Sequence, residues 1–149
     1  MAYEITNPIV GAQPIADTST TQLNPLGLIV QAVDPVLGAG EFVYLKGVAS
    51  TVVGSFVTYN SSDNSTALLA ANAIGPVGLA MSINVASSYG WYQISGKGVG
   101  KALAGFADNA NVYATATAGS IDDAVVAGDR VKLTKGASAV GTPSTGLAY

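Results

Sequence analysis

The chain has 149 residues, of which 6 are Lys or Arg and 9 are Asp or Glu, and it contains no His and no Cys. Without cysteine there is no disulfide framework, no thiolate nucleophile and no cysteine-ligated zinc; without histidine there is no imidazole base and no histidine metal site. Six scattered cationic residues cannot neutralise many phosphates, which argues against nucleic-acid binding. The length fits one domain with its own core.

Charged residues make up 10% of the chain, less than half of the roughly 25% that is usual, while apolar residues make up 49%. A monomer exposed to water normally has a more charged surface. The composition therefore favours a subunit whose surface is covered by self-association or by packing into an assembly. The alternative is a surface built from Ser, Thr and Asn, in which the chain is also rich.

The N-terminus has neither the basic region nor the apolar run of a signal peptide, so we expect none. No charged residue occurs between Asp63 and Lys97, which gives this stretch a high hydropathy. Asn72, Pro76 and Asn84 interrupt it, and no run of about 18–20 apolar residues exists. We therefore predict that the chain has no membrane span.

Residues 1–27 are predicted to form an extended arm. Pro8, Pro14 and Pro25 disfavour a helix, and the apolar residues of the arm show no helical period. Such an arm docks either on its own domain or on a neighbouring subunit, and the simpler alternative is a frayed terminus. The spaced apolar side chains favour docking.

From residue 28 onward the pattern is typical of β-structure. Short apolar runs rich in β-formers alternate with turn residues, and no convincing helix of ten or more residues occurs. Two segments, 66–71 and 121–126, fit either a strand or a short helical turn, and we favour extended structure for both. The remaining strands are predicted over residues 28–33, 42–46, 52–59, 77–85, 91–95, 111–117 and 130–134.

The clearest predicted strand covers residues 77–85, where apolar and small or polar residues alternate without a break. Its apolar face comprises Val77, Leu79, Met81, Ile83 and Val85. Period-two alternation predicts a half-buried antiparallel strand. The same pattern in residues 130–134 predicts that the side chains of positions 131 and 133 point inward.

Several short strands separated by turns predict an all-β fold, a small antiparallel β-barrel or β-sandwich. We expect residues 28–149 to form a single β domain, preceded by the arm of residues 1–27.

A glycine-rich segment around Lys97 and Lys101 invites comparison with a phosphate-binding loop. A Walker loop requires Gly where Ser95 stands and Ser or Thr where Ala102 stands, so the spacing fails. The dinucleotide-binding pattern fails too, because Lys101 occupies its third glycine position. We interpret the segment as a glycine-rich strand that bends the sheet, and we predict no cofactor.

Two acidic or amide-rich groups, residues 108–111 and Asp122–Asp123 with Asp129, have enough oxygen atoms for weak Ca²⁺ contact. Neither has the ligand count or the terminal Glu of an EF-hand, and Asp and Asn are common in turns and caps. With no nucleophile motif present either, the sequence predicts no metal ligands, no catalytic residues and no enzymatic activity.

Tyr89, Trp91 and Tyr92 form the only aromatic cluster of the sequence. Trp and Tyr are enriched at protein interfaces, so the cluster is a candidate anchor. The equally weighted alternative is that Trp91 fills the core of a small barrel.

Four phrases give the chain a resemblance to a known class of proteins, in addition to its Pro-punctuated arm. They are GAGEFVYLKG (38–47), GPVGLA (75–80), YGWYQISG (89–96) and AGSIDDAVVAGD (118–129). Together they resemble small virion proteins of tailed bacteriophages, especially capsid decoration (cement) proteins. The resemblance spans most of residues 28–135. It rests on these short sequence segments and includes no catalytic motif from which residue roles could be assigned.

The resemblance implies a β-barrel or β-sandwich that binds the outer surface of the mature phage head and braces it against internal pressure. Its partners would be the major capsid protein and further copies of itself, with a trimer favoured over a dimer. It would bind neither nucleic acid nor membrane. It would be made in the host cytoplasm and located on the capsid exterior of the virion. The candidate contact residues are Ile5, Ile9, Ile15, Leu23 and Leu26 of the arm, with Tyr89, Trp91 and Tyr92.

Two other function classes compete with this reading. A tail or fibre module of a phage virion would present aromatic side chains and polar loops to a host receptor. A small-ligand β-barrel or an enzyme would require an internal pocket with convergent polar groups, and the absence of His and Cys makes it the weakest of the three.

Overall fold

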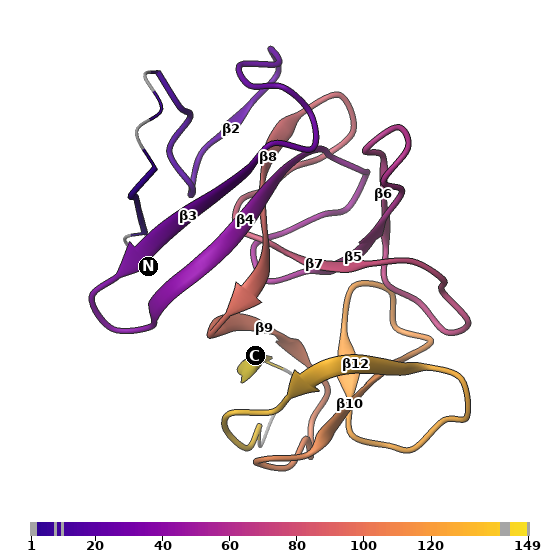
Figure 1. Cartoon of the computed structure of the whole chain (residues 1–149). Helices are drawn as coiled ribbons and strands as arrows, with labels where there is room; N and C mark the ends of the chain where they lie inside the picture. The colour runs from indigo at the N-terminus through magenta and orange to yellow at the C-terminus, as the bar shows by residue number, and fades with distance from the viewer. Residues whose placement is uncertain (1–2, 8, 10, 141–143, 149) are drawn as a thin grey trace.

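The computed structural model describes residues 3–7, 9, 11–140 and 144–148, which form thirteen β-strands and no helix (Figure 1). The predicted all-β fold is confirmed. Within these residues there is accordingly no helical segment that would cross a lipid bilayer. The strands build two sheets, of eight and five strands, which lie one above the other in Figure 1.

The larger sheet curls into a half-barrel in the strand order β1-β3-β4-β8-β7-β5-β6, with β2 paired to β8 in addition (Figure 1). All its pairings are antiparallel. The strands are β1 (Glu4–Ile5), β2 (Thr18–Ser19), β3 (Ile29–Asp34), β4 (Gly38–Lys46), β5 (Phe56–Tyr59), β6 (Thr66–Leu68), β7 (Val77–Ala80) and β8 (Tyr89–Gly96).

The β3–β4 hairpin illustrates why these residues form strands. Along β3, Val30, Ala32 and Asp34 are buried and the residues that alternate with them are exposed, as period-two alternation requires. The strand ends at Asp34, whose carboxylate accepts the main-chain N–H groups of Val36 and Leu37 at 2.8 Å each. This Asx turn reverses the chain into β4.

The smaller sheet has the order β12-β10-β11-β9-β13. Its strands are β9 (Gly98–Ala102), β10 (Asn111–Ala114), β11 (Ile121–Asp122), β12 (Arg130–Lys135) and β13 (Ser144–Ala148). Only β9 and β11 pair in parallel among the described strands. The chain passes from β8 of the larger sheet into β9 of the smaller sheet through one residue, Lys97, so the two sheets are closely joined.

A shared apolar core connects the two sheets. Phe56 and Leu79 of the larger sheet pack with Val112 and Ile121 of the smaller sheet and with Phe106 from the loop before β10. Two further clusters lie on the opposite faces of the larger sheet, one under the arm and one inside the half-barrel. Burial of these side chains is the main stabilising contribution to the fold.

The arm lies on its own domain. β1 pairs with β3 and β2 pairs with β8. Between them, Ile15 is buried in one cluster with Phe42 and Trp91. Of the two docking modes expected for the arm, the described residues of this chain adopt the intramolecular one.

Several predicted strands are shorter in the structure, and the clearest case is residues 77–85. β7 ends at Ala80, so the prediction that Ile83 and Val85 share its buried face is wrong: both are exposed, whereas Ser82 and Asn84 are buried. The cause is the arm, because the Ser82 hydroxyl donates to a main-chain carbonyl of the arm and Asn84 accepts a hydrogen bond from Thr18.

Three other predicted strands are also shorter in the structure. The strand predicted over 52–59 begins only at Phe56, the one over 111–117 ends at Ala114, and the one over 121–126 ends at Asp122.

The prediction for position 133 is also wrong. Val131 is buried as expected, but the Leu133 side chain is fully exposed and its φ of 61° lies in the left-handed region. The pairing of β10 with β12 jumps here, from Val112 opposite Val131 to Asn111 opposite Lys135. Residues 132–134 therefore form a bulge of three extra residues, which turns Leu133 away from the core.

Candidate functional site

The eight predicted contact residues fall into three groups by exposure. Ile15, Trp91 and Tyr92 are buried, so in this chain they have no surface to offer to a partner. Ile5, Ile9, Leu26 and Tyr89 are half-buried against the cluster under the arm. Leu23 is 55% exposed.

Trp91 fills the space between β8 and the arm. Its indole Nε1–H donates to the main-chain carbonyl of Gln13 at 2.7 Å, and its ring meets that of Tyr44 edge-on with centroids 5.0 Å apart. The Tyr44 hydroxyl in turn donates to the Gln13 side chain at 2.7 Å. Trp91 is therefore a core residue, but it packs under the arm and not inside the half-barrel, where the alternative interpretation places it.

Tyr92 points to the opposite face of β8, into the half-barrel. Burial raises the pKa of Tyr92 to about 12, and the polar side chains of Thr66, Asn84 and Thr51 offset part of this effect. Its phenol is therefore neutral over the physiological range, and no charged partner has to enter the half-barrel.

The acidic residues mostly shape turns and loops. Asp63 and Asp123 accept main-chain N–H groups of nearby loops, and Asp129 accepts that of Asn72 at 2.7 Å. Among the described residues, no three His, Cys, Asp or Glu side chains gather as a metal site would require. The acidic side chains seen here act as hydrogen-bond acceptors for the backbone.

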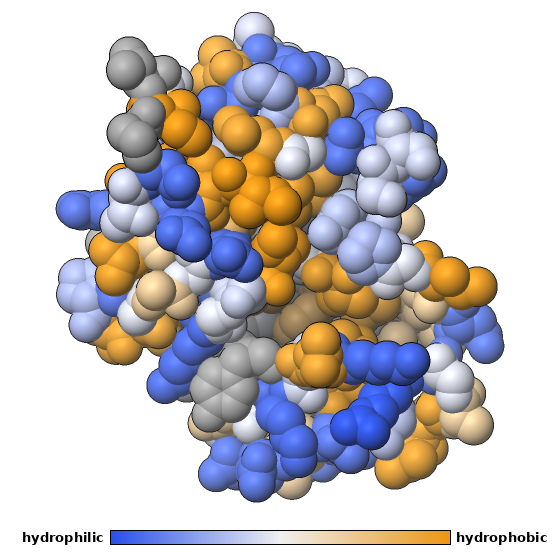
Figure 2. Space-filling view, viewed as in Figure 1, coloured by the Kyte–Doolittle hydropathy of each residue, from blue (hydrophilic) through white to orange (hydrophobic). Residues whose placement is uncertain are grey.

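The described surface has a cleft of about 740 Å³ where the two sheets meet, called here the intersheet cleft. Its floor comes from β7 and β8, one rim from the loop before β7 and the other rim from β12. Figure 2 shows apolar side chains gathered along this hollow and hydrophilic ones bordering it on the side of the smaller sheet. A volume of this size lies in the range of ligand sites.

Two large aliphatic side chains stand on the rims of the intersheet cleft. Ile74, on the loop before β7, is 96% exposed, and Leu133, on the bulge of β12, is fully exposed. Leucine in the left-handed region costs roughly 1–2 kcal/mol, and exposing it to water brings no compensating burial. The smaller-sheet rim therefore carries an apolar side chain on a strained backbone.

The polar groups of the cleft differ between floor and rim. On the floor, Gln93 is only 5% exposed; its Nε2 donates to the main-chain carbonyls of Ser95 and Lys97 at 3.1 Å each. Its Oε1 has no hydrogen-bond partner among the described residues and lies over Gly98. This leaves a buried, unpaired acceptor beneath the cleft, with no surface exposed to it.

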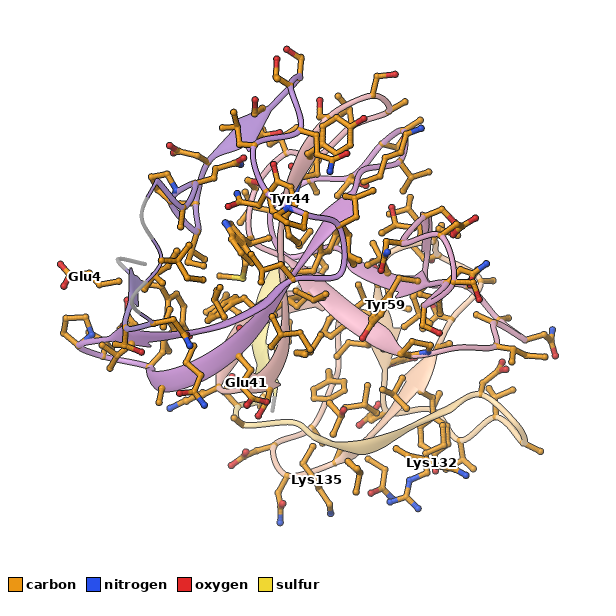
Figure 3. All side chains as sticks on the ribbon, turned by 45° about the horizontal axis from the view of Figure 1, so that its top comes forward. Glu4, Glu41, Tyr44, Tyr59, Lys132 and Lys135 are labelled. Carbon is orange, nitrogen blue, oxygen red and sulfur yellow. The ribbon has the colours of Figure 1, made fainter. Side chains whose placement is uncertain are left out.

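The rim formed by β12 is basic. Three of the six cationic residues of the chain lie on this strand: Arg130, Lys132 and Lys135. Figure 3 shows Lys132 and Lys135 extending from β12 away from the larger sheet, and Glu41 on β4. Arg130 donates to Asn111 at 3.1 Å and Lys135 to the carbonyl of Asn109 at 3.2 Å. Lys132 makes no such bond with a described residue, so its charge is available.

Sequence reasoning missed the intersheet cleft. Its residues extend from Phe56 to Thr134, and no local pattern brings them together. The alternation in β12 even suggested the reverse orientation for Leu133. The one usable signal was the concentration of cationic residues between positions 130 and 135 in a charge-poor chain.

Comparisons with protein-family models, with curated proteins and with solved structures return no significant match to this chain.

Proposed function

We propose that this chain is a structural virion protein, a capsid decoration protein that binds the outer surface of a mature phage head through the major capsid protein and stabilises the shell. In this proposal it acts as a homo-oligomer, with a trimer favoured, and it has no catalytic role. The resemblance in phrase, the all-β fold and the charge-poor composition support it.

One observation carries the proposal most directly: large aliphatic side chains are exposed on a chain with only 10% charged residues. Among the residues whose side chains are described, the most exposed of these are Val36, Ile74, Val125 and Leu133. Exposed aliphatics that occur singly are normal. The support for the proposal therefore comes from their combination with the low charge of the surface, which favours a subunit that is covered in an assembly. A decoration protein must supply such contact area over much of its surface.

The fold changes which arm residues are suitable as contacts. Most apolar side chains of the arm cover their own domain, and among the candidates Leu23 is the one left exposed. We therefore assign the arm's proposed contact with the capsid to the segment around Leu23. Its neighbour Gln22 is also exposed and provides a matched control.

The proposal is tested by mixing the purified protein with bare, expanded capsids and measuring co-sedimentation and the thermal stability of the shells. We expect saturable binding and shells that resist a higher temperature. Leu23→Ser should lower occupancy by roughly tenfold while Gln22→Ser leaves it unchanged, because only the first removes buried apolar area at the interface. Absence of co-sedimentation would refute the proposal.

A tail or fibre module remains the second candidate, and the intersheet cleft is the observation that favours it, because a receptor-binding module needs a concave site. Copy number separates the two roles: a decoration protein is present in hundreds of copies per particle, whereas a tail-tip protein is present in few. Quantitative gel analysis of purified particles gives this number.

A further inference from the structure

We infer that the intersheet cleft is a docking site for an extended peptide segment that carries alternating acidic and apolar side chains. The inference goes beyond the proposed function, since it concerns peptide binding by the free protein and holds for a segment of any partner protein. Four features of the cleft lead to it.

The first feature is the pair of aliphatic side chains on the rims. Ile74, on the loop before β7, and Leu133, on β12, both line the cleft and are both almost completely exposed. A segment lying between the sheets would cover both at once, and burying a large aliphatic side chain is favourable. Occupation of the cleft would also account for a leucine kept in a left-handed conformation on a solvent-exposed bulge.

The second feature is the floor of the cleft, which is partly apolar. Val77 of β7 and Ile94 of β8 line the cleft, and both side chains are half-buried. The side chains of a bound segment that face this floor would therefore be apolar.

The third feature is the position of β12 at the end of the smaller sheet. In the described part of the chain its outer edge has no strand partner. Residues 130–134 all line the cleft, so the strand itself runs along the cleft. The bulge at Leu133 limits strand addition to the neighbourhood of Arg130 and Lys132, which favours a short extended segment over a long strand.

The fourth feature is charge. The chain has a net charge of −3, yet β12 carries three cationic residues and no acidic one, and two of the three, Arg130 and Lys132, line the cleft. The neighbouring Asp129 is 6% exposed and its carboxylate accepts the N–H of Asn72. The rim therefore attracts acidic side chains, which would alternate with apolar ones along an extended peptide.

Two synthetic fluorescein-labelled hexapeptides test the inference, one alternating Asp and Val and the other alternating Lys and Val. Binding is followed by fluorescence anisotropy at low salt with the full-length protein and no capsids. We expect the acidic peptide to bind at least roughly tenfold more tightly than the basic one, with an affinity that falls as salt is added.

Two charge-reversal variants provide the matched comparison. Lys132→Glu should weaken binding of the acidic peptide by roughly fivefold or more, whereas Lys46→Glu changes the net charge equally at an exposed position outside the cleft and should leave it unchanged. Circular dichroism checks that both variants fold.

Three outcomes would overturn the inference: no saturable binding up to about 1 mM peptide, equal affinity for the two peptides, or equal effects of the two variants. A single-stranded DNA oligonucleotide is tested as a competitor alongside the unlabelled acidic peptide. If the two compete equally well, the basic rim binds nucleic acid, and this result would also overturn the inference. Because capsids are absent from the assay, its outcome is independent of whether the protein decorates a phage head.

Discussion

The indole Nε1–H of Trp91 donates to the main-chain carbonyl of Gln13 at 2.7 Å, and both residues are buried although 78 positions separate them in the sequence. This bond fastens the arm to the centre of the larger sheet. The Gln13 side chain completes the connection, because it accepts the Tyr44 hydroxyl and donates to the carbonyls of Asp17 and Tyr89. The arm is thus an integral part of the domain core.

Gln13→Ala should lower the free energy of unfolding by about 1–3 kcal/mol, because it leaves the buried Tyr44 hydroxyl without its acceptor. Urea titration followed by the fluorescence of Trp91, the only tryptophan, measures the change. Gln22→Ala removes a glutamine from an exposed position of the same arm and should cost less than about 0.5 kcal/mol. Equal stabilities of the two variants would show that the arm is not anchored at Gln13.

Gly47→Ala should be strongly destabilising for a steric reason. A Cβ atom at this position would overlap the main-chain carbonyl of Asn84, where Val48 also donates to that same oxygen at 3.0 Å. Two backbone segments would have to separate, which we expect to cost about 2–3 kcal/mol in urea unfolding. Gly128, with a φ of 91° and open space around it, is the comparison: Gly128→Ala should cost only about 1 kcal/mol of backbone strain. A Gly47→Ala protein as stable as the Gly128→Ala protein would contradict the close approach.

The stability of the protein should fall at high pH because of Tyr92. Its pKa rises from 10 to about 12 on folding, since burial disfavours the phenolate. The corresponding stability is fully present below pH 10 and is lost as the pH rises toward 12, by about 3 kcal/mol at most. Urea titrations at pH 9, 10, 11 and 12 should show this loss in the wild-type protein and a smaller one in Tyr92→Phe.

At pH 7 the Tyr92→Phe substitution should lower the free energy of unfolding by less than about 1 kcal/mol, because the hydroxyl has no hydrogen-bond partner among the described residues. Parallel pH profiles would exclude Tyr92 as the cause.

Leu133→Asn should stabilise the free protein and weaken peptide binding. Asparagine tolerates the left-handed φ of 61° better than leucine, which should raise the free energy of unfolding by about 0.5–1 kcal/mol. The loss of an aliphatic rim side chain should weaken binding of the acidic hexapeptide by roughly fivefold. Val125→Asn, at another exposed aliphatic residue outside the cleft, should change neither quantity by a comparable amount. A gain in stability with unchanged binding would separate the strain at Leu133 from any role in docking.

Local patterns predicted much of the secondary structure. The alternation in residues 28–33 and the turn at Asp34 correspond to β3 and the hairpin that follows it, and the run at 42–46 lies within β4. The same alternation was misleading at Ile83 and at Leu133. Alternation indicates which side chains share a face, but the end of a strand depends on partners elsewhere: the arm captures the turn after β7, and a shift in pairing with β10 creates the bulge of β12.

The sequence by itself determined the all-β class and, through the absence of His and Cys, the chemistry that the chain lacks. It also indicated a surface poor in charge. Only the tertiary structure decided that Trp91 is a core residue and that Ile74, Gln93 and Leu133 line one cleft. The physical reason is that composition and periodicity are local properties, whereas burial and the meeting of two sheets depend on contacts between residues far apart in the chain.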